Sequence, residues 1–156
     1  MHLKALMVAI TSVSVLAVSI AGQSTSPQSV PFVGADACRD CHTDYYQAWS
    51  ATKHARAITR LTSNDRAGGL CIRCHVTGTP EMIAADGAMP RFPNVQCEAC
   101  HGAGRAHVEA AQAGNAALAR IDTVNAATCT RCHNESSPNY KTFIYNALIG
   151  LVHRRG

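Results

Sequence analysis

The chain has 156 residues, and its 14 Lys and Arg against 10 Asp and Glu leave a formal net charge of +4. The basic residues are scattered and no stripe of aromatic and basic side chains accompanies them, which argues against a nucleic-acid-binding protein. With 3 Phe, 4 Tyr and 1 Trp the chain can build only a modest hydrophobic core, and its length suits one domain rather than two of full size.

The N-terminus has the pattern of a secretory signal peptide. Lys4 precedes an almost wholly apolar or small stretch over residues 5–20, and Ser19-Ile20-Ala21 ends it with the small residues of a cleavage site. We therefore expect residues 1–21 to be a signal peptide that is removed on export. An uncleaved membrane anchor is the alternative, because the apolar stretch approaches the length that spans a bilayer.

Two segments follow the expected cleavage site. Residues 22–33 are rich in Ser, Gln and Pro, and this composition predicts a flexible leader. Residues 34–156 are then expected to form a single domain.

The first helix expected in this domain follows residue 42. Thr43 or Asp44 can cap it, and it would run through Trp49 towards Arg60, with Gly68-Gly69 as its far limit.

Two further helices are expected towards the C-terminus. Residues 104–120 are rich in alanine, which favours a helix, with an interruption at Gly114-Asn115. Ser137-Pro138 has the pattern of a helix N-cap followed by proline at the first helical position. The apolar face of that last helix would carry Tyr140, Ile144, Ala147 and Leu151. Prolines at 80, 90 and 93 predict a loop, and no region has the pattern of a group of strands.

One five-residue pattern, Cys-x-x-Cys-His, occurs four times, at residues 38–42, 71–75, 97–101 and 129–133. We call these the first, second, third and fourth motif. Their thiols are Cys38, Cys41, Cys71, Cys74, Cys97, Cys100, Cys129 and Cys132, and their imidazoles are His42, His75, His101 and His133. This pattern is the attachment signature of c-type haem.

The spacing has a chemical reason. Two thiols three positions apart can add to the two vinyl groups on one edge of a porphyrin, while the next imidazole reaches the iron from one face. The sequence therefore predicts four covalently bound haem c groups, each with a proximal histidine. A disulfide framework and paired zinc ribbons are the alternatives, and both leave the four motif histidines without a role.

The histidines outside the motifs supply candidates for the other face of each iron. They are His2, His54, His107 and His153, and His2 leaves with the signal peptide. Three distal ligands, His54, His107 and His153, are thus expected for four irons. His107 lies only six residues after His101, and so short a segment would have to pass around the edge of the haem to reach the opposite face of the same iron. We therefore expect His107 to bind the iron of another haem.

One iron is left without a distal histidine. Met82 or Met89 could ligate it, since a thioether binds haem iron, or a neighbouring molecule could lend a ligand. The iron could also stay five-coordinate.

Several runs of the sequence resemble a known family. They are residues 33–38 through Trp49 with Lys53-His54-Ala55, residues 71–78, residues 95–105, and residues 129–133 with 137–140 and the late His153. These runs are similar to the tetrahaem cytochrome c family that accepts electrons from hydroxylamine oxidoreductase, and to the wider multihaem cytochromes that share its fold.

The resemblance implies a fold and a set of ligands. The fold is mainly α with long loops, compact, with a haem-dominated core and little or no β structure. His107 would be distal ligand at the first motif, His54 at the third and His153 at the fourth. The iron on His75 would be five-coordinate.

These observations predict a periplasmic or otherwise extracytoplasmic electron carrier and not an enzyme. It would relay electrons from a periplasmic oxidoreductase to another cytochrome or a quinone system. Two alternatives stay open. One is a haem enzyme that reduces nitric oxide or peroxide at an open second haem, and the other is a subunit of a polymerising cytochrome filament that self-associates.

Overall fold

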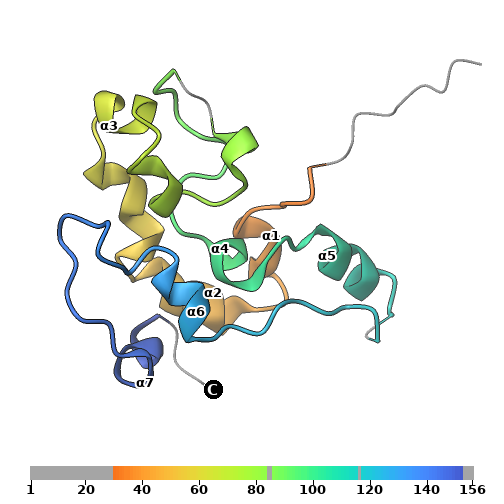
Figure 1. Cartoon of the computed structure of the whole chain (residues 1–156). Coiled ribbons are helices and arrows are strands. Elements are labelled where there is room, and N and C mark those ends of the chain that lie inside the picture. The colour runs from red at the N-terminus through yellow and green to blue at the C-terminus, as the bar shows by residue number, and fades with distance from the viewer. Residues whose placement is uncertain (1–29, 84–85, 116, 153–156) are drawn as a thin grey trace, which may run out of the picture.

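The computed structural model describes residues 30–83, 86–115 and 117–152 (Figure 1). Short helices joined by long irregular segments make up this part of the chain. Its α-helices are α1 (Asp36–Arg39), α2 (Thr43–Ser50), α3 (Ser63–Ala67), α4 (Cys97–His101), α5 (Arg105–Gln112), α6 (Ala126–Thr130) and α7 (Tyr145–Leu148). Its 3-10 helices are η1 (His54–Arg60), η2 (Ile72–Cys74), η3 (Pro80–Met82) and η4 (Ile149–Leu151).

The expected fold class is confirmed for the described residues. They form helices and loops and no strand, and the one β-type pairing among them is an isolated bridge between Val76 and Pro93. The expected signal peptide, residues 1–21, lies outside the described residues. Among the helices that are described, none combines the length and the apolar character needed to cross a bilayer.

The continuous helix expected from Thr43 towards Arg60 is wrong. Helix α2 ends at Ser50, and the chain re-enters helical geometry only at η1, which is itself kinked at Arg56. Thr52 explains the break, because its hydroxyl donates to Trp49 O at 2.7 Å and accepts from Ala55 N at 3.4 Å. A threonine that bonds to nearby backbone competes with the helix for the same groups.

The interruption expected at Gly114-Asn115 is confirmed. Helix α5 ends at Gln112, and Gly114 follows with φ of +71°, a conformation that glycine adopts without steric cost. The helix does not resume over the described residues 117–120, which form a turn and irregular chain.

The helix expected to start at Ser137-Pro138 is also wrong, since α7 begins at Tyr145. Tyr140 N donates to Ser137 O at 3.0 Å in a turn, and Asn134 holds the chain just before it, residues 130–136, in turns as well. The amide nitrogen of Asn134 donates to Thr130 O at 2.9 Å and Arg131 O at 3.0 Å, and its side-chain oxygen accepts from Ser136 N at 2.9 Å. This local bonding uses backbone groups in turns rather than in a new helix.

The hydrophobic core formed by the polypeptide itself is small and lies around the second motif. Ile58, Ile72 and Val76 form a buried cluster, and Leu61 and Ile83 pack against it. Ile72 is the most deeply buried large side chain in the described residues, with 1% of its surface exposed.

The end of the expected flexible leader is packed against the domain, which corrects that expectation for residues 30–33. Phe32 is 9% exposed, and its ring centre lies 6.4 Å from that of Phe92. Backbone oxygens of Val30 and Pro31 accept hydrogen bonds from Arg105, at 2.6 Å and 3.0 Å. Burial of a large aromatic side chain is strongly stabilising, so Phe32 holds this end of the leader against the domain.

Candidate haem attachment and ligation sites

Each motif forms a single helical turn. His42 N donates to Cys38 O at 2.9 Å and His133 N donates to Cys129 O at 2.9 Å, while the third motif is helix α4 itself. The second motif is tighter, with His75 N bonded to Ile72 O at 2.8 Å. Residues three and four positions apart lie on the same side of such a turn, so each turn presents both thiols and the imidazole together. This is the arrangement that covalent haem attachment needs.

The turns of the four motifs lie against one another. The Cys38 thiol of the first motif is hydrogen-bonded to Cys97 of the third. Arg131 of the fourth motif donates to Ala99 O of the third at 3.1 Å, and the thiol of Cys132 in the fourth motif lies close to that of Cys74 in the second. The attachment turns therefore adjoin in the order first, third, fourth, second.

The thiols at these contacts respond to one another. The hydrogen bond between them lowers the pKa of Cys38 and raises that of Cys97. Burial raises the pKa of Cys132 to about 12, and the neighbouring Cys74 adds to the rise. The sulfur atoms of the first and third motifs, and those of the second and fourth, thus lie close together, so porphyrins attached to them would have neighbouring edges.

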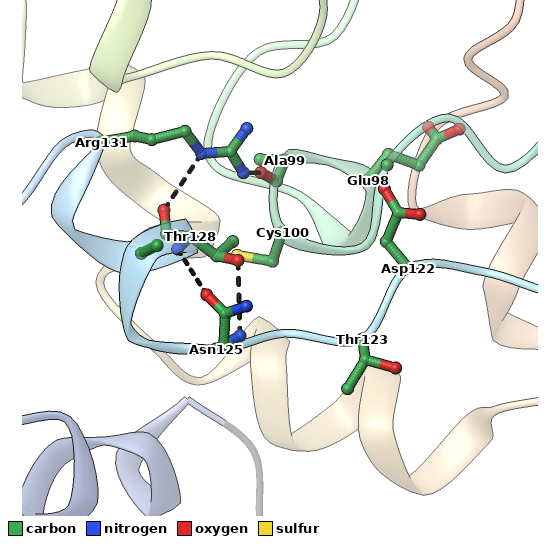
Figure 2. A pocket seen from close by; sticks show the side chains of 10 residues that line it. Glu98, Ala99, Cys100, Asp122, Thr123, Asn125, Thr128 and Arg131 are labelled. Carbon is green, nitrogen blue, oxygen red and sulfur yellow. Dashed lines mark hydrogen bonds between the residues drawn. The ribbon is translucent and has the colours of Figure 1, made fainter.

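A cavity of about 420 Å³ opens beside the contact between the third and fourth motifs. Figure 2 shows Arg131 reaching across from α6 to Ala99, where it donates to the carbonyl oxygen at 3.1 Å, and shows Cys100 beside them. The lining also includes Glu98, Gly102, Asp122, Thr123, Asn125, Ala127 and Thr128. Because Cys100 is one of the predicted attachment thiols, this space adjoins the haem site predicted at the third motif.

His107 lies opposite His42. Their ring centres are 6.1 Å apart and their planes are inclined by only 22°. Two metal–imidazole bonds of about 2 Å each, with half a five-membered ring at either end, span about 6 Å. The pair therefore fits the two faces of one iron.

The hydrogen bond of His107 favours the same role. Its Nδ1 lies 2.9 Å from Ala119 O, and because a carbonyl oxygen can only accept, Nδ1 carries the proton. Nε2 keeps its lone pair for a metal, and the backbone bond orients the ring.

His54 lies near His133 of the fourth motif, with ring centres 5.9 Å apart and planes inclined by 62°. Phe143 stacks on the His133 ring at 4.9 Å. Burial lowers the pKa of His54, with a smaller contribution from His133, so this imidazole is kept neutral and able to bind metal. This position differs from the one that the resemblance implies, which assigns His54 to the third motif.

The other two motif histidines are held by backbone carbonyls. His75 Nδ1 lies 2.7 Å from Ala57 O, and His101 Nδ1 lies 3.2 Å from Asp122 O. Both contacts direct the proton to Nδ1 and leave Nε2 for iron. The expected ligand His153 lies outside the described residues.

The methionines show no special relation to an iron site. Met89 is 58% exposed, and Met82 packs over Gly78, whose added side chain would lie 3.3 Å from the methionine sulfur. Neither position favours ligation over ordinary loop packing.

Neither a disulfide framework nor a zinc ribbon is supported by the arrangement of the cysteines. None of the eight cysteines forms a disulfide. In residues 30–83, 86–115 and 117–152, no three His, Cys, Asp or Glu side chains converge on a site for a metal ion.

Sequence reasoning missed the segment that joins the motifs, residues 94–96. Asn94 adopts φ of +73°, and its side-chain oxygen accepts from Ile58 N at 3.0 Å, while Val95 N donates to His54 O at 3.1 Å. Gln96 accepts from Ala35 N at 2.7 Å, just before the first motif. An asparagine between proline and an attachment motif is a weak signal of this left-handed turn.

Glu98 was missed as well. It lies between the two cysteines of the third motif, is 2% exposed, and binds the backbone ahead of the first motif. An acidic residue at a variable position of the motif carries no signal of burial on its own.

Residues 37–102 match the family model described as cytochrome c554 and c-prime. The solved structure of reduced cytochrome c554 from Nitrosomonas europaea is similar at 24% sequence identity over 80% of this chain and 79% of that chain, with a TM-score of 0.46. No curated protein matches the chain. The resemblance indicated by the motifs is confirmed for the region of the family match, which contains the first three of them.

Proposed function

Given that residues 37–102 match the cytochrome c554 and c-prime family, we propose that the chain is a tetrahaem electron carrier. The family match implies covalently bound haem c, and the number four comes from the motifs. The observation that supports the proposal best is that two histidines from outside the motifs face motif histidines, His107 at 6.1 Å from His42 and His54 at 5.9 Å from His133 between ring centres.

Distal ligands follow from the placement of the histidines. His107 is proposed for the iron on His42, and His54 for the iron on His133, because each pair has the ring separation of two imidazoles on one metal. His153 is then left for the iron on His101. The iron on His75 has no distal histidine in this scheme.

Haem iron, when bound, accepts and releases one electron at a time between its ferric and ferrous states. The residues of the chain hold the ligands for this exchange. Ala57, Asp122 and Ala119 each fix a histidine by a carbonyl oxygen on Nδ1, so the rings need not reorient when the oxidation state changes.

We further propose an extracytoplasmic location, with the periplasm as the expected compartment, because c-type haem is attached outside the bacterial cytoplasm. The partners would be a periplasmic oxidoreductase as donor and another cytochrome or a quinone system as acceptor.

Mass spectrometry of the exported protein tests the cofactor content. Four haem adducts per chain are expected, and fewer adducts, or bound zinc, would contradict the proposal.

Electron paramagnetic resonance of the ferric protein tests the ligands. His107→Ala and His54→Ala should each convert one low-spin signal to high spin, because each removes a strong axial ligand. Glu109→Gln, on the same helix as His107 but exposed, is the matched control and should leave all signals unchanged. Unchanged spectra in both histidine variants would overturn the ligand assignments.

A further inference from the structure

Glu98 is the most deeply buried charged side chain in the described residues, with 2% of its surface exposed. It lies on α4, between the two attachment thiols of the third motif. A charged group is costly to bury, so its surroundings must compensate for the water it has lost.

Backbone amides provide that compensation. The carboxylate accepts from Val33 N at 3.0 and 3.1 Å, from Gly34 N at 2.7 Å and from Gly104 N at 2.7 Å. A side chain at Gly104 would lie 3.0 Å from a carboxylate oxygen, so glycine is what allows this close approach. Among residues 30–83, 86–115 and 117–152, no Lys, Arg or His forms an ion pair with Glu98.

The negative charge is therefore satisfied by hydrogen bonds but not neutralised by a cation. Its field acts where the first and third motifs meet. Its carboxylate accepts from Val33 N and Gly34 N just ahead of the first motif, and Glu98 itself lies between the two cysteines of the third.

A charge of opposite sign lies at the next contact along the series. Arg131 of the fourth motif donates to Ala99 O of the third at 3.1 Å (Figure 2). Arg131 is exposed, so solvent screens its charge more than that of Glu98.

We propose that Glu98 and Arg131 set the direction of electron flow, with Glu98 holding the first and third sites at low reduction potential and Arg131 favouring reduction at the fourth. A nearby negative charge disfavours adding an electron to a ferric centre, and the effect is largest where the charge is buried. An electron that a reduced redox partner gives to the first or the third site then moves towards the fourth. This inference rests on the proposed function, since it requires haem at these motifs.

Potentiometric titration of the intact holoprotein, followed by electron paramagnetic resonance, tests the inference. The first and fourth sites are identified by the low-spin signals lost in His107→Ala and His54→Ala. Glu98→Gln should raise the potentials of the first and third sites and leave the fourth nearly unchanged. Arg131→Gln should lower the potentials of the third and fourth sites, while Arg131→Lys, which keeps the charge, should restore them.

Controls separate charge from structure. Glu109→Gln removes an exposed carboxylate of α5 and should shift no potential. If Glu98→Gln gives no mature protein, Gln96→Glu adds a charge beside the same amides without changing side-chain size, and it should lower the potential of the first site.

The outcomes are distinct. Holoprotein with four haems whose potentials do not respond to these charge changes would overturn the inference and leave the proposed function intact. A chain that carries no haem would remove the proposed function itself.

Discussion

The third motif, which forms helix α4, and the fourth, which begins at the end of α6, have the same pattern but are held in different ways. Helix α4 has no side-chain cap, and its Glu98 is buried and bonded to backbone distant in sequence. Helix α6 buries no residue and begins with a capping box in which Asn125 and Thr128 bond to each other's backbone. The third motif is thus stabilised by tertiary contacts and the fourth by local hydrogen bonds. A substitution that destabilises the third motif should therefore lower the stability of more of the molecule.

The substitution Glu98→Ala tests most directly whether α4 is held by tertiary contacts. It leaves three buried or partly buried N–H groups without acceptors, at about 1–3 kcal/mol each, so we expect a loss of at least about 3 kcal/mol in the free energy of unfolding. Guanidinium unfolding of the holoprotein, followed by circular dichroism, measures the loss. Glu109→Ala, at an exposed position, should cost less than about 0.5 kcal/mol. Equal losses in the two variants would show that α4 is not fixed by Glu98.

The second motif is stabilised in a third way, by apolar packing of its own side chain in the core. Ile72 lies within the motif and in the centre of the small core, so Ile72→Ala should cost about 3 kcal/mol through lost burial and a residual cavity. Ile72→Val removes one methylene and should cost about 1 kcal/mol. A loss below about 1 kcal/mol for the alanine variant, in the same unfolding measurement, would mean that this core contributes little.

Removing the cap of α6 should have a smaller and more local effect. Asn125→Ala should cost about 1 kcal/mol, because Thr128 N loses its acceptor. Hydrogen exchange should show faster exchange in residues 126–130 and unchanged exchange in α4. Asn125→Asp keeps an acceptor at the same position and should retain the protection. Faster exchange in α4 would contradict the local character of this support.

The smallest effect is expected at α3, whose capping box is exposed. The side chain of Thr62 lowers the pKa of Asp65 below its ordinary value of 3.8. A carboxylate with a lowered pKa stabilises the folded state above its unfolded pKa, and that contribution is lost as the pH falls through the folded value. Wild type should therefore lose stability below about pH 4 slightly faster than Asp65→Asn, with the two profiles converging in strong acid. Parallel acid-unfolding curves for the two proteins would exclude a role for the ionised cap.

The sequence alone indicated the four attachment turns, the absence of strands and the break at Gly114. These features depend on residues close together in the chain, such as two thiols and an imidazole on one helical turn. The sequence also suggested three distal ligands, because few histidines remained outside the motifs. It misjudged the helices near Thr52 and Asn134, since in both places a polar side chain bonds to the neighbouring backbone and no apolar pattern reveals this.

The pairing of His54 with His133, the order in which the motifs adjoin and the burial of Glu98 were decided by the tertiary structure. Each joins segments far apart in the chain, and each depends on where the backbone turns at Thr52, Asn94 and Gly104. Periodicity records which face of a local segment is apolar, but it contains no information about which distant segment that face will meet.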